Sequence, residues 1–190
     1  MDNYKIIGNI EEYIDDIIKL DDDFYDTDYI WTNEYQLDVY KRNKDSFIAI
    51  ELNGELIGYL NYLCIKDSTY NKIIESNITI DDFELNEIVE YQEGDNYITI
   101  NSIVIKKEYQ DTNIIKYLTD GLLSKLKVLE ENNKHIAGIN GIAISEDGIK
   151  FFKNLGFTNV KLLKDNNSLF YLDKDVVMTI EDSINKLKNK

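Results

Sequence analysis

The sequence has no proline and contains one cysteine, one histidine and nine glycines in 190 residues. A lone cysteine, Cys64, cannot form a disulfide within the chain, which favours a reducing compartment. One cysteine and one histidine also exclude the common zinc sites, which use three or four such ligands. The N-terminus lacks the basic region and apolar run of a secretion signal. We therefore expect a cytoplasmic protein without a metal.

Long apolar runs are also missing. No stretch approaches the roughly 20 apolar residues that a bilayer-spanning helix needs, so we expect no membrane partner. The hydrophobic content of 43% is nevertheless enough for one sizeable core in a chain of this length. We predict one domain over residues 1–175 and a short C-terminal helical tail over 176–190.

Positive charge is scarce in the first half of the chain. The net charge is −15 overall, with −17 on residues 1–95 and +2 on residues 96–190. Because non-specific nucleic-acid binding depends on Lys and Arg neutralising phosphates, we expect no nucleic-acid partner. The asymmetry favours a cationic partner for the first half. The alternative is an acidic, solvated surface that keeps the protein soluble.

Apolar periodicity predicts alternating strands and helices. We expect strands at 4–7, 46–52, 55–65, 97–105, 135–144, 159–165 and 168–173. We expect helices after Asn9 and after "QDTN", at 32–42, 69–76, 81–91 and 146–155, and after Thr179. Asn53-Gly54 predicts a type I′ hairpin turn. The long helix after "QDTN" should bury a stripe of Ile115, Leu118, Leu122, Leu126 and Leu129.

Two motifs in this element order resemble the GCN5-related N-acetyltransferase (GNAT) superfamily. "AISEDGIKFFKNLGF", residues 143–157, is similar to the family's fifth strand, its following helix and a closing Leu-Gly-Phe. "INSIVIKKEYQDTNIIKYL", residues 100–118, is similar to the fourth strand and the Q/R-x-x-G-x-G/A loop that opens the third helix. The resemblance spans roughly residues 4–173.

The resemblance implies a fold and an activity. The fold is α/β (α+β), with a central mixed, mostly antiparallel sheet of about seven strands flanked by helices and splayed between the fourth and fifth strands. The implied activity is transfer of an acetyl group from acetyl-coenzyme A (acetyl-CoA) to a primary amine. An alternative is a catalytically impaired GNAT-fold protein that binds acyl-CoA as a sensor or serves as a protein-interaction module.

By the resemblance, the cofactor's pantetheine pairs with strand backbone, and its pyrophosphate lies on N–H groups of the loop. The strand residues are Ile103, Val104 and Ile105. The loop residues are Gln110, Asp111, Thr112, Asn113, Ile114 and Ile115. Asn113 and Ile115 stand where the family has glycine and glycine or alanine. Since Asn tolerates left-handed geometry, and Ile115 is expected to face the core, the loop should still receive acetyl-CoA.

The resemblance leaves the general base and acid unknown. Phe152 stands where family members often have an acidic tyrosine, and Thr99 where some have a glutamate. Ser145 stands in place of an asparagine and is expected to cap a helix. Glu87, Tyr91 and Tyr97 are candidates near the expected site, although each fits a surface or packing role better.

The strip "DDDFYDTDY", residues 21–29, is the candidate acceptor wall. In the family, the connection between the first two helices borders the acceptor site, and carboxylates and aromatic faces both attract an ammonium group. We name Tyr25, Asp26 and Asp28 as acceptor-binding residues and expect a cationic small-molecule or peptide amine. A solvated loop explains the strip as well. A homodimer is compatible with the sequence.

Overall fold

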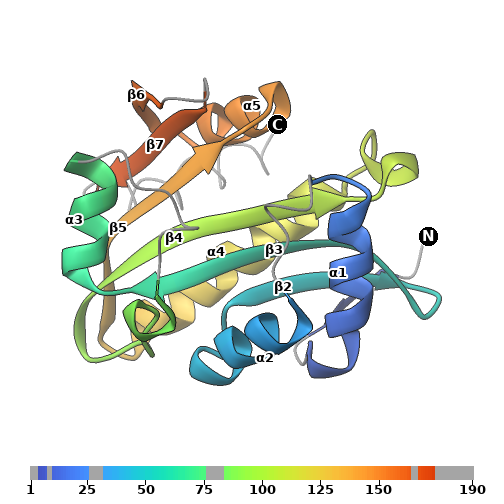
Figure 1. Ribbon diagram of the computed structural model, residues 1–190, viewed down its shortest axis with the longest axis horizontal. Helices are drawn as coiled ribbons and strands as arrows, with labels where there is room; N and C mark the ends of the chain where they lie inside the picture. Colours follow the sequence, from blue (N-terminus) through green and yellow to red (C-terminus); the bar gives the residue numbers. More distant parts are fainter. Residues whose placement is uncertain (1–3, 8–9, 26–31, 76–83, 164–166, 174–190) are drawn as a thin grey trace.

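The computed structural model describes residues 4–7, 10–25, 32–75, 84–163 and 167–173. Seven strands form one sheet in the order β1-β2-β3-β4-β5-β7-β6 (Figure 1). They are β1 Tyr4–Ile7, β2 Phe47–Leu52, β3 Glu55–Ile65, β4 Gly94–Ile105, β5 Lys134–Ala143, β6 Thr158–Leu162 and β7 Ser168–Asp173. β4 and β5 run parallel and the other neighbours antiparallel, which confirms the predicted mixed sheet. The expected tail, 176–190, lies outside the described residues.

The β2–β3 hairpin forms at the predicted turn. Asn53 has a φ of 54° and Gly54 a φ of 86°, so both central residues have the positive φ of a type I′ turn. The turn leads into β3, in which every residue after Glu55 is buried. β3 therefore lies in the middle of the core, with both faces covered.

Helices cover both faces of the sheet. α1 (Ile14–Asp22) and α2 (Asn33–Arg42) lie in front of it in Figure 1, and α4 (Ile114–Glu131) lies behind it. α3 (Asp67–Glu75) follows β3, and α5 (Glu146–Asn154) follows β5. None of the described helices is both long and apolar enough to cross a bilayer.

The buried stripe of α4 begins one residue earlier than predicted. Ile114 is fully buried, whereas Ile115 is half-buried, so the assignment of Ile115 to the stripe is wrong. The buried residues are Ile114, Leu118, Leu122, Leu126 and Leu129. Ile114 lies four residues before Leu118 and shares its face, whereas Ile115 is turned by about 100°.

The helix predicted over 81–91 is wrong in its described part, 84–91. The chain makes one 3-10 turn at Leu85–Glu87 and then an antiparallel bridge between Ile88 and Ile65. Ile88 is only 1% exposed. Burial of this side chain against the edge of β3 therefore overrides the local helical pattern.

β4 and β5 separate part-way along their length. Their pairing runs from Gly94–Lys134 to Ile100–Gly141. Beyond that point β4 continues beside β3 to Ile105, while β5 continues beside β7 to Ala143. Figure 1 shows the two strands diverging. We call this place the fork, and residues 101–105 the open edge of β4.

Candidate functional site

Backbone alternation determines which groups β4 presents at its open edge. The N–H of Lys106 donates to the carbonyl of Ile57 at 3.0 Å, and Val104 lies opposite Tyr59 two residues earlier. Because bonded pairs alternate along an antiparallel ladder, the backbone of Val104 faces β3. The backbone groups of Ile103 and Ile105 therefore face the fork.

Two side chains contact this edge. The amide of Gln110 donates to the carbonyl of Ile105 at 3.1 Å. The hydroxyl of Tyr25 interacts with the backbone of Ile103 and lies 2.9 Å from the hydroxyl of Ser102. The edge thus already supports polar contacts of the kind that an extended ligand would make.

The loop between β4 and α4 reaches the helix without a glycine. It forms a 3-10 turn at Lys107–Tyr109, and the hydroxyl of Thr112 donates to the carbonyl of Tyr109 at 2.5 Å. Asn113 is the N-cap of α4 with a φ of −79°, an ordinary value for any residue. The absence of glycine therefore causes no backbone strain here, and left-handed tolerance is not needed.

The first turn of α4 is suited to an anion. The first intrahelical bond runs from the N–H of Tyr117 to the carbonyl of Asn113 at 3.2 Å, so the preceding N–H groups have no helical acceptor. That of Ile114 donates instead to the hydroxyl oxygen of Thr112 at 3.4 Å. The turn contains no acidic residue. Thr112 and Asn113 are exposed, and the helix dipole adds positive potential at this end.

A chain of hydroxyl groups leads from the open edge into the protein. The hydroxyl of Ser102 lies 3.0 Å from that of Tyr59, which in turn donates to the carboxylate of Asp21. The amide of Gln36 also donates to Asp21, at 3.4 Å. Asp21 is 5% exposed at the end of α1, whereas Ser102 and Tyr25 are half-buried.

Burial tunes the acid–base behaviour of this chain. It raises the pKa of Asp21 to about 6, although the hydrogen bonds from Tyr59 and Gln36 act in the opposite direction. Burial, followed by the nearby charge of Asp21, also raises the pKa of Tyr59 well above its ordinary value. Tyr59 therefore remains a proton donor, while Asp21 changes its charge close to neutral pH.

Sequence reasoning missed Asp21, although a signal was present. Ile10, Ile14 and Ile17 form an apolar helical stripe, and Asp21 occupies its next position. A carboxylate on an apolar face is unusual, since an unpaired buried charge is costly. The acidic strip is expected to act through Asp26 and Asp28, which lie outside the described residues.

Asn140 lies at the base of the fork, opposite Thr99 on β4. It is 0% exposed, and neither atom of its side-chain amide has a hydrogen-bond partner among the described residues. Since buried polar atoms are nearly always paired, this amide is suited to a water or a ligand group.

Phe152 closes the other side of the base. It is 4% exposed and stacks on Phe170 with ring centroids 5.1 Å apart. Ser145 accepts a hydrogen bond from the N–H of Gly148 at 3.1 Å, which confirms its role as a helix cap. Neither residue supplies an acid or base.

The other sequence candidates have structural contacts. Glu87 accepts from the hydroxyl of Thr69 at 3.1 Å and lies 3.7 Å from the ammonium of Lys72. The ring of Tyr97 lies 4.8 Å from that of Tyr70. Tyr91 is buried in the main core. These contacts fit the packing roles that the sequence favoured.

Cys64 is also buried, and burial raises the pKa of its thiol to about 12. A thiol with such a pKa is almost entirely protonated at neutral pH. Cys64 is therefore not a nucleophile.

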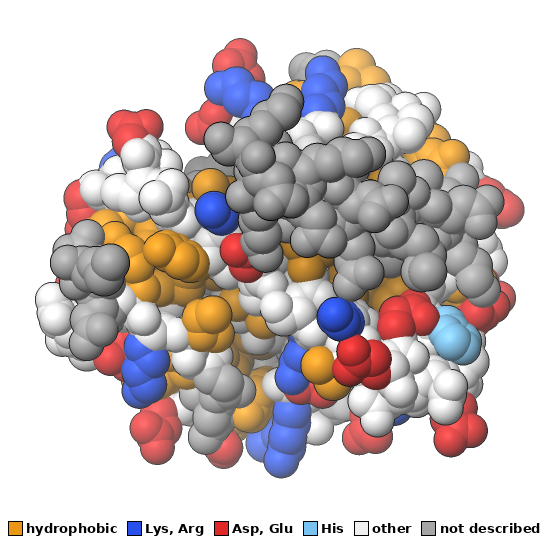
Figure 2. Space-filling model, turned by 180° about the vertical axis from the view of Figure 1, so that it is seen from behind, with side chains coloured by type: hydrophobic (Ala, Val, Ile, Leu, Met, Phe, Trp, Pro, Cys, Tyr) orange, Lys and Arg blue, Asp and Glu red, His pale blue; other side chains and the backbone are white. Residues whose placement is uncertain are grey.

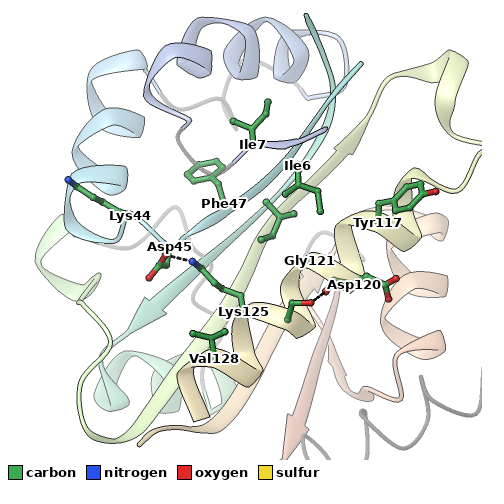
Figure 3. Close-up of a pocket in the computed structure, with 12 residues that line it drawn as sticks. Ile6, Ile7, Lys44, Asp45, Phe47, Tyr117, Asp120, Gly121, Lys125 and Val128 are labelled. Atoms are coloured by element: carbon green, nitrogen blue, oxygen red, sulfur yellow. Dashed lines mark hydrogen bonds and ion pairs between the residues drawn. The ribbon is translucent and has the colours of Figure 1, made fainter. Parts of the chain in front are cut away.

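A hollow of about 360 Å³ lies elsewhere, between β1, β2 and α4 (Figure 3). Ile6 and Phe47 form one side, Tyr117 and Val128 the other, and the ion pair of Lys125 with Asp45 crosses one end. On the α4 side, apolar side chains lie between rim charges of both signs (Figure 2). The hollow is separate from the fork, and none of Tyr25, Ser102, Tyr59 and Asp21 lines it.

No protein-family model matches the chain, and no curated protein matches its sequence. Solved structures do match its fold. Ard1 from Thermoplasma volcanium superposes with a TM-score of 0.61 and 13% identity over 90% of this chain and 97% of Ard1. NAA60 from Arabidopsis thaliana in complex with acetyl-CoA superposes with a TM-score of 0.59 and 15% identity over 92% of this chain and 99% of NAA60.

GphF, a GNAT-like decarboxylase in complex with isobutyryl-CoA, gives a TM-score of 0.65 and 8% identity over 89% of this chain and 98% of GphF. Identities this low establish the fold alone. The chain therefore has the GNAT fold, as its two motifs implied.

Proposed function

We propose that this protein transfers an acetyl group from acetyl-CoA to a primary amine. The observation that carries the proposal is the fork, where β4 leaves β5 after Ile100 and presents Ile103 and Ile105 at an open edge. The same strand leads directly into the N-terminus of α4, a position suited to phosphate.

The residues present fit the cofactor. Ile103 and Ile105 would pair with its pantetheine amides, while Val104 holds the strand against β3. The loop from Gln110 to Ile115 would hold the pyrophosphate on backbone N–H groups, helped by an N-cap with ordinary geometry. Ile115 is half-buried at the margin of the core, whereas the smaller side chains of Thr112 and Asn113 are exposed.

The acceptor would be a cationic small-molecule or peptide amine. The half of the chain that carries −17 includes α1, α2 and the strip at 21–29, whereas the proposed cofactor residues, 103–105 and 110–115, lie in the half that carries +2. A negative surface concentrates cations near it. We further propose that Tyr25, Asp26 and Asp28 contact this amine, and that the protein is cytoplasmic.

A catalytically impaired sensor or interaction module is the second candidate. Phe152 favours it, because a phenylalanine cannot protonate a leaving thiolate. A thiolate leaves readily without that help, so the substitution slows the reaction without preventing it. Turnover separates the two candidates.

Calorimetry with acetyl-CoA, followed by a thiol-release assay with a panel of amines, tests the function. Asn113→Asp is the informative variant. A carboxylate at the N-cap stabilises α4 but repels phosphates, so the affinity for acetyl-CoA should fall about tenfold while the fold is kept. Asn132→Asp places the same charge at the other end of α4 and should leave the affinity unchanged.

Absence of binding to the unmodified chain at millimolar acetyl-CoA would contradict the proposal. Binding without release of thiol with any amine would favour the sensor.

A further inference from the structure

Asp21 is a buried carboxylate whose hydrogen-bond donors are neutral. Among the described residues, its donors are the hydroxyl of Tyr59 on β3 and the amide of Gln36 on α2. Of the described titratable groups, Tyr25 and, along its own helix, Asp22 also act on it. None of these groups is a cation, so the negative charge of Asp21 is only partly compensated.

An asparagine would serve a purely structural role better than Asp21. An amide oxygen accepts from Tyr59 as a carboxylate does. An amide N–H could donate to the Oε1 atom of Gln36, which has no hydrogen-bond partner among the described residues. The carboxylate therefore imposes a desolvation cost that the packing does not require, and such costs concentrate at functional sites.

The hydrogen bond from Tyr59 to Asp21 fixes the direction of the other hydrogen bonds between these hydroxyl groups. Each hydroxyl has one hydrogen, and that of Tyr59 points to Asp21. The oxygen of Tyr59 must then accept from Ser102, and the oxygen of Ser102 must accept from Tyr25. All donors point from the open edge of β4 towards the buried carboxylate, an arrangement that can move a proton inwards.

We propose that Asp21 is the final acceptor of the proton released by the attacking amine, and that Tyr25, Ser102 and Tyr59 conduct it. This inference rests on the proposed acetyl transfer. Tyr25 would touch the amine, because its hydroxyl lies beside the Ile103 backbone at the open edge. Asp21 acts through the three hydroxyls.

Acetyl transfer to a neutral amine releases one proton from its nitrogen. The neutral amine nitrogen forms a bond to the thioester carbon, and the carbon–sulfur bond breaks with its electron pair leaving on sulfur. The excess proton on nitrogen passes to the oxygen of Tyr25, whose own proton moves to Ser102. The proton of Ser102 then moves to Tyr59, and that of Tyr59 moves to Asp21. The thiolate takes a proton from solvent, and Asp21 later returns its proton along the chain.

The state of Asp21 suits this task. With its pKa raised to about 6, the carboxylate is mostly ionised at pH 7.5 and is therefore free to accept a proton. It is also a stronger base than a carboxylate with the ordinary pKa of 3.8. The activity should therefore fall as the pH is lowered through about 6.

The test is the pH profile of kcat/KM in Asp21→Asn, with Glu131→Gln as the control. Asp21→Asn keeps the shape of the site and the bond from Tyr59, and its amide N–H donates to Gln36 Oε1 once the Gln36 amide turns over, so acetyl-CoA affinity measured by calorimetry should stay within twofold. Its kcat should fall by at least about tenfold, and the acidic limb near pH 6 should disappear. Glu131→Gln removes an exposed carboxylate from the far end of α4 and should keep both the rate and the limb.

A second pair of variants interrupts the path elsewhere. Ser102→Ala removes the middle hydroxyl and should slow turnover as Asp21→Asn does, whereas Ser102→Thr keeps a hydroxyl and should restore it. If the unmodified chain acetylates an amine while Asp21→Asn retains both rate and limb, the proton path is overturned and the transfer function stands. If acetyl-CoA does not bind, the function fails and the path fails with it.

Discussion

Phe152 packs its ring against Gly141 at the point where β4 and β5 separate. A Cβ atom on Gly141 would overlap the tip of this ring and would also lie 3.2 Å from the carbonyl oxygen of Ile100. Glycine is thus required at position 141 because the Phe152 ring and the Ile100 carbonyl oxygen lie too close for a Cβ atom, and not because of its backbone angles. The pair holds α5 against the base of the fork.

Gly141→Ala should therefore lower the free energy of unfolding by about 1–3 kcal/mol, because a well-packed core resists an added methyl group. Urea denaturation measures this. The same substitution in a Phe152→Leu background should cost clearly less than in the unmodified chain. Equal costs in both backgrounds would show that the ring is not the obstacle.

Ile114 and Ile115 should differ in what their removal costs. Ile114→Ala empties a fully buried position and should lower the free energy of unfolding by about 2–4 kcal/mol. Ile115→Ala should cost about 1 kcal/mol, since its side chain is half-buried. Acetyl-CoA titration of Ile115→Ala is the second measurement. Markedly tighter binding in that variant would show that Ile115 obstructs the pyrophosphate.

Asp21 should make stability depend on pH. Its folded pKa, about 6, lies above its ordinary value of 3.8, so the folded state holds the proton more tightly than the unfolded one. The stabilising contribution is therefore complete below about pH 4 and is lost as the pH rises through about 6. Relative to the unmodified chain, Asp21→Asn should gain about 2–3 kcal/mol between pH 4 and pH 8. A flat difference in urea unfolding across this range would contradict the raised pKa.

Asp26 and Asp28 should affect the acceptor and not the cofactor. Replacing both with Asn weakens the negative potential near the proposed amine site, so KM for a cationic amine should rise severalfold. Added salt should raise KM in the unmodified chain and have less effect in the variant. Calorimetry with acetyl-CoA should give the same affinity for both proteins. An anionic best substrate, or activity indifferent to salt, would show that the charge asymmetry has no part in recognition.

Features that depend on near neighbours in the chain could be predicted from the sequence. The Asn53-Gly54 turn requires positive φ at two consecutive residues, and few other pairs adopt it easily. Ser145 caps α5 through the N–H of a residue three positions later. The motif at 100–118 covers the end of β4 and the start of α4, and the motif at 143–157 covers the last residue of β5 and α5, so both report on elements beside the fork.

Tertiary structure decided what depends on distant contacts. Ile88 forms a bridge with Ile65 at the end of β3. The sequence around Ile88 cannot predict this pairing, because it depends on where β3 lies in the fold. The choice between Ile114 and Ile115 depends on how α4 is rotated against the sheet, and adjacent apolar residues leave that rotation open. The hydroxyl chain from Tyr25 to Asp21 joins side chains up to 81 positions apart, on α1 and the turn after it, on β3 and on β4. Only their packing makes a buried aspartate a candidate base.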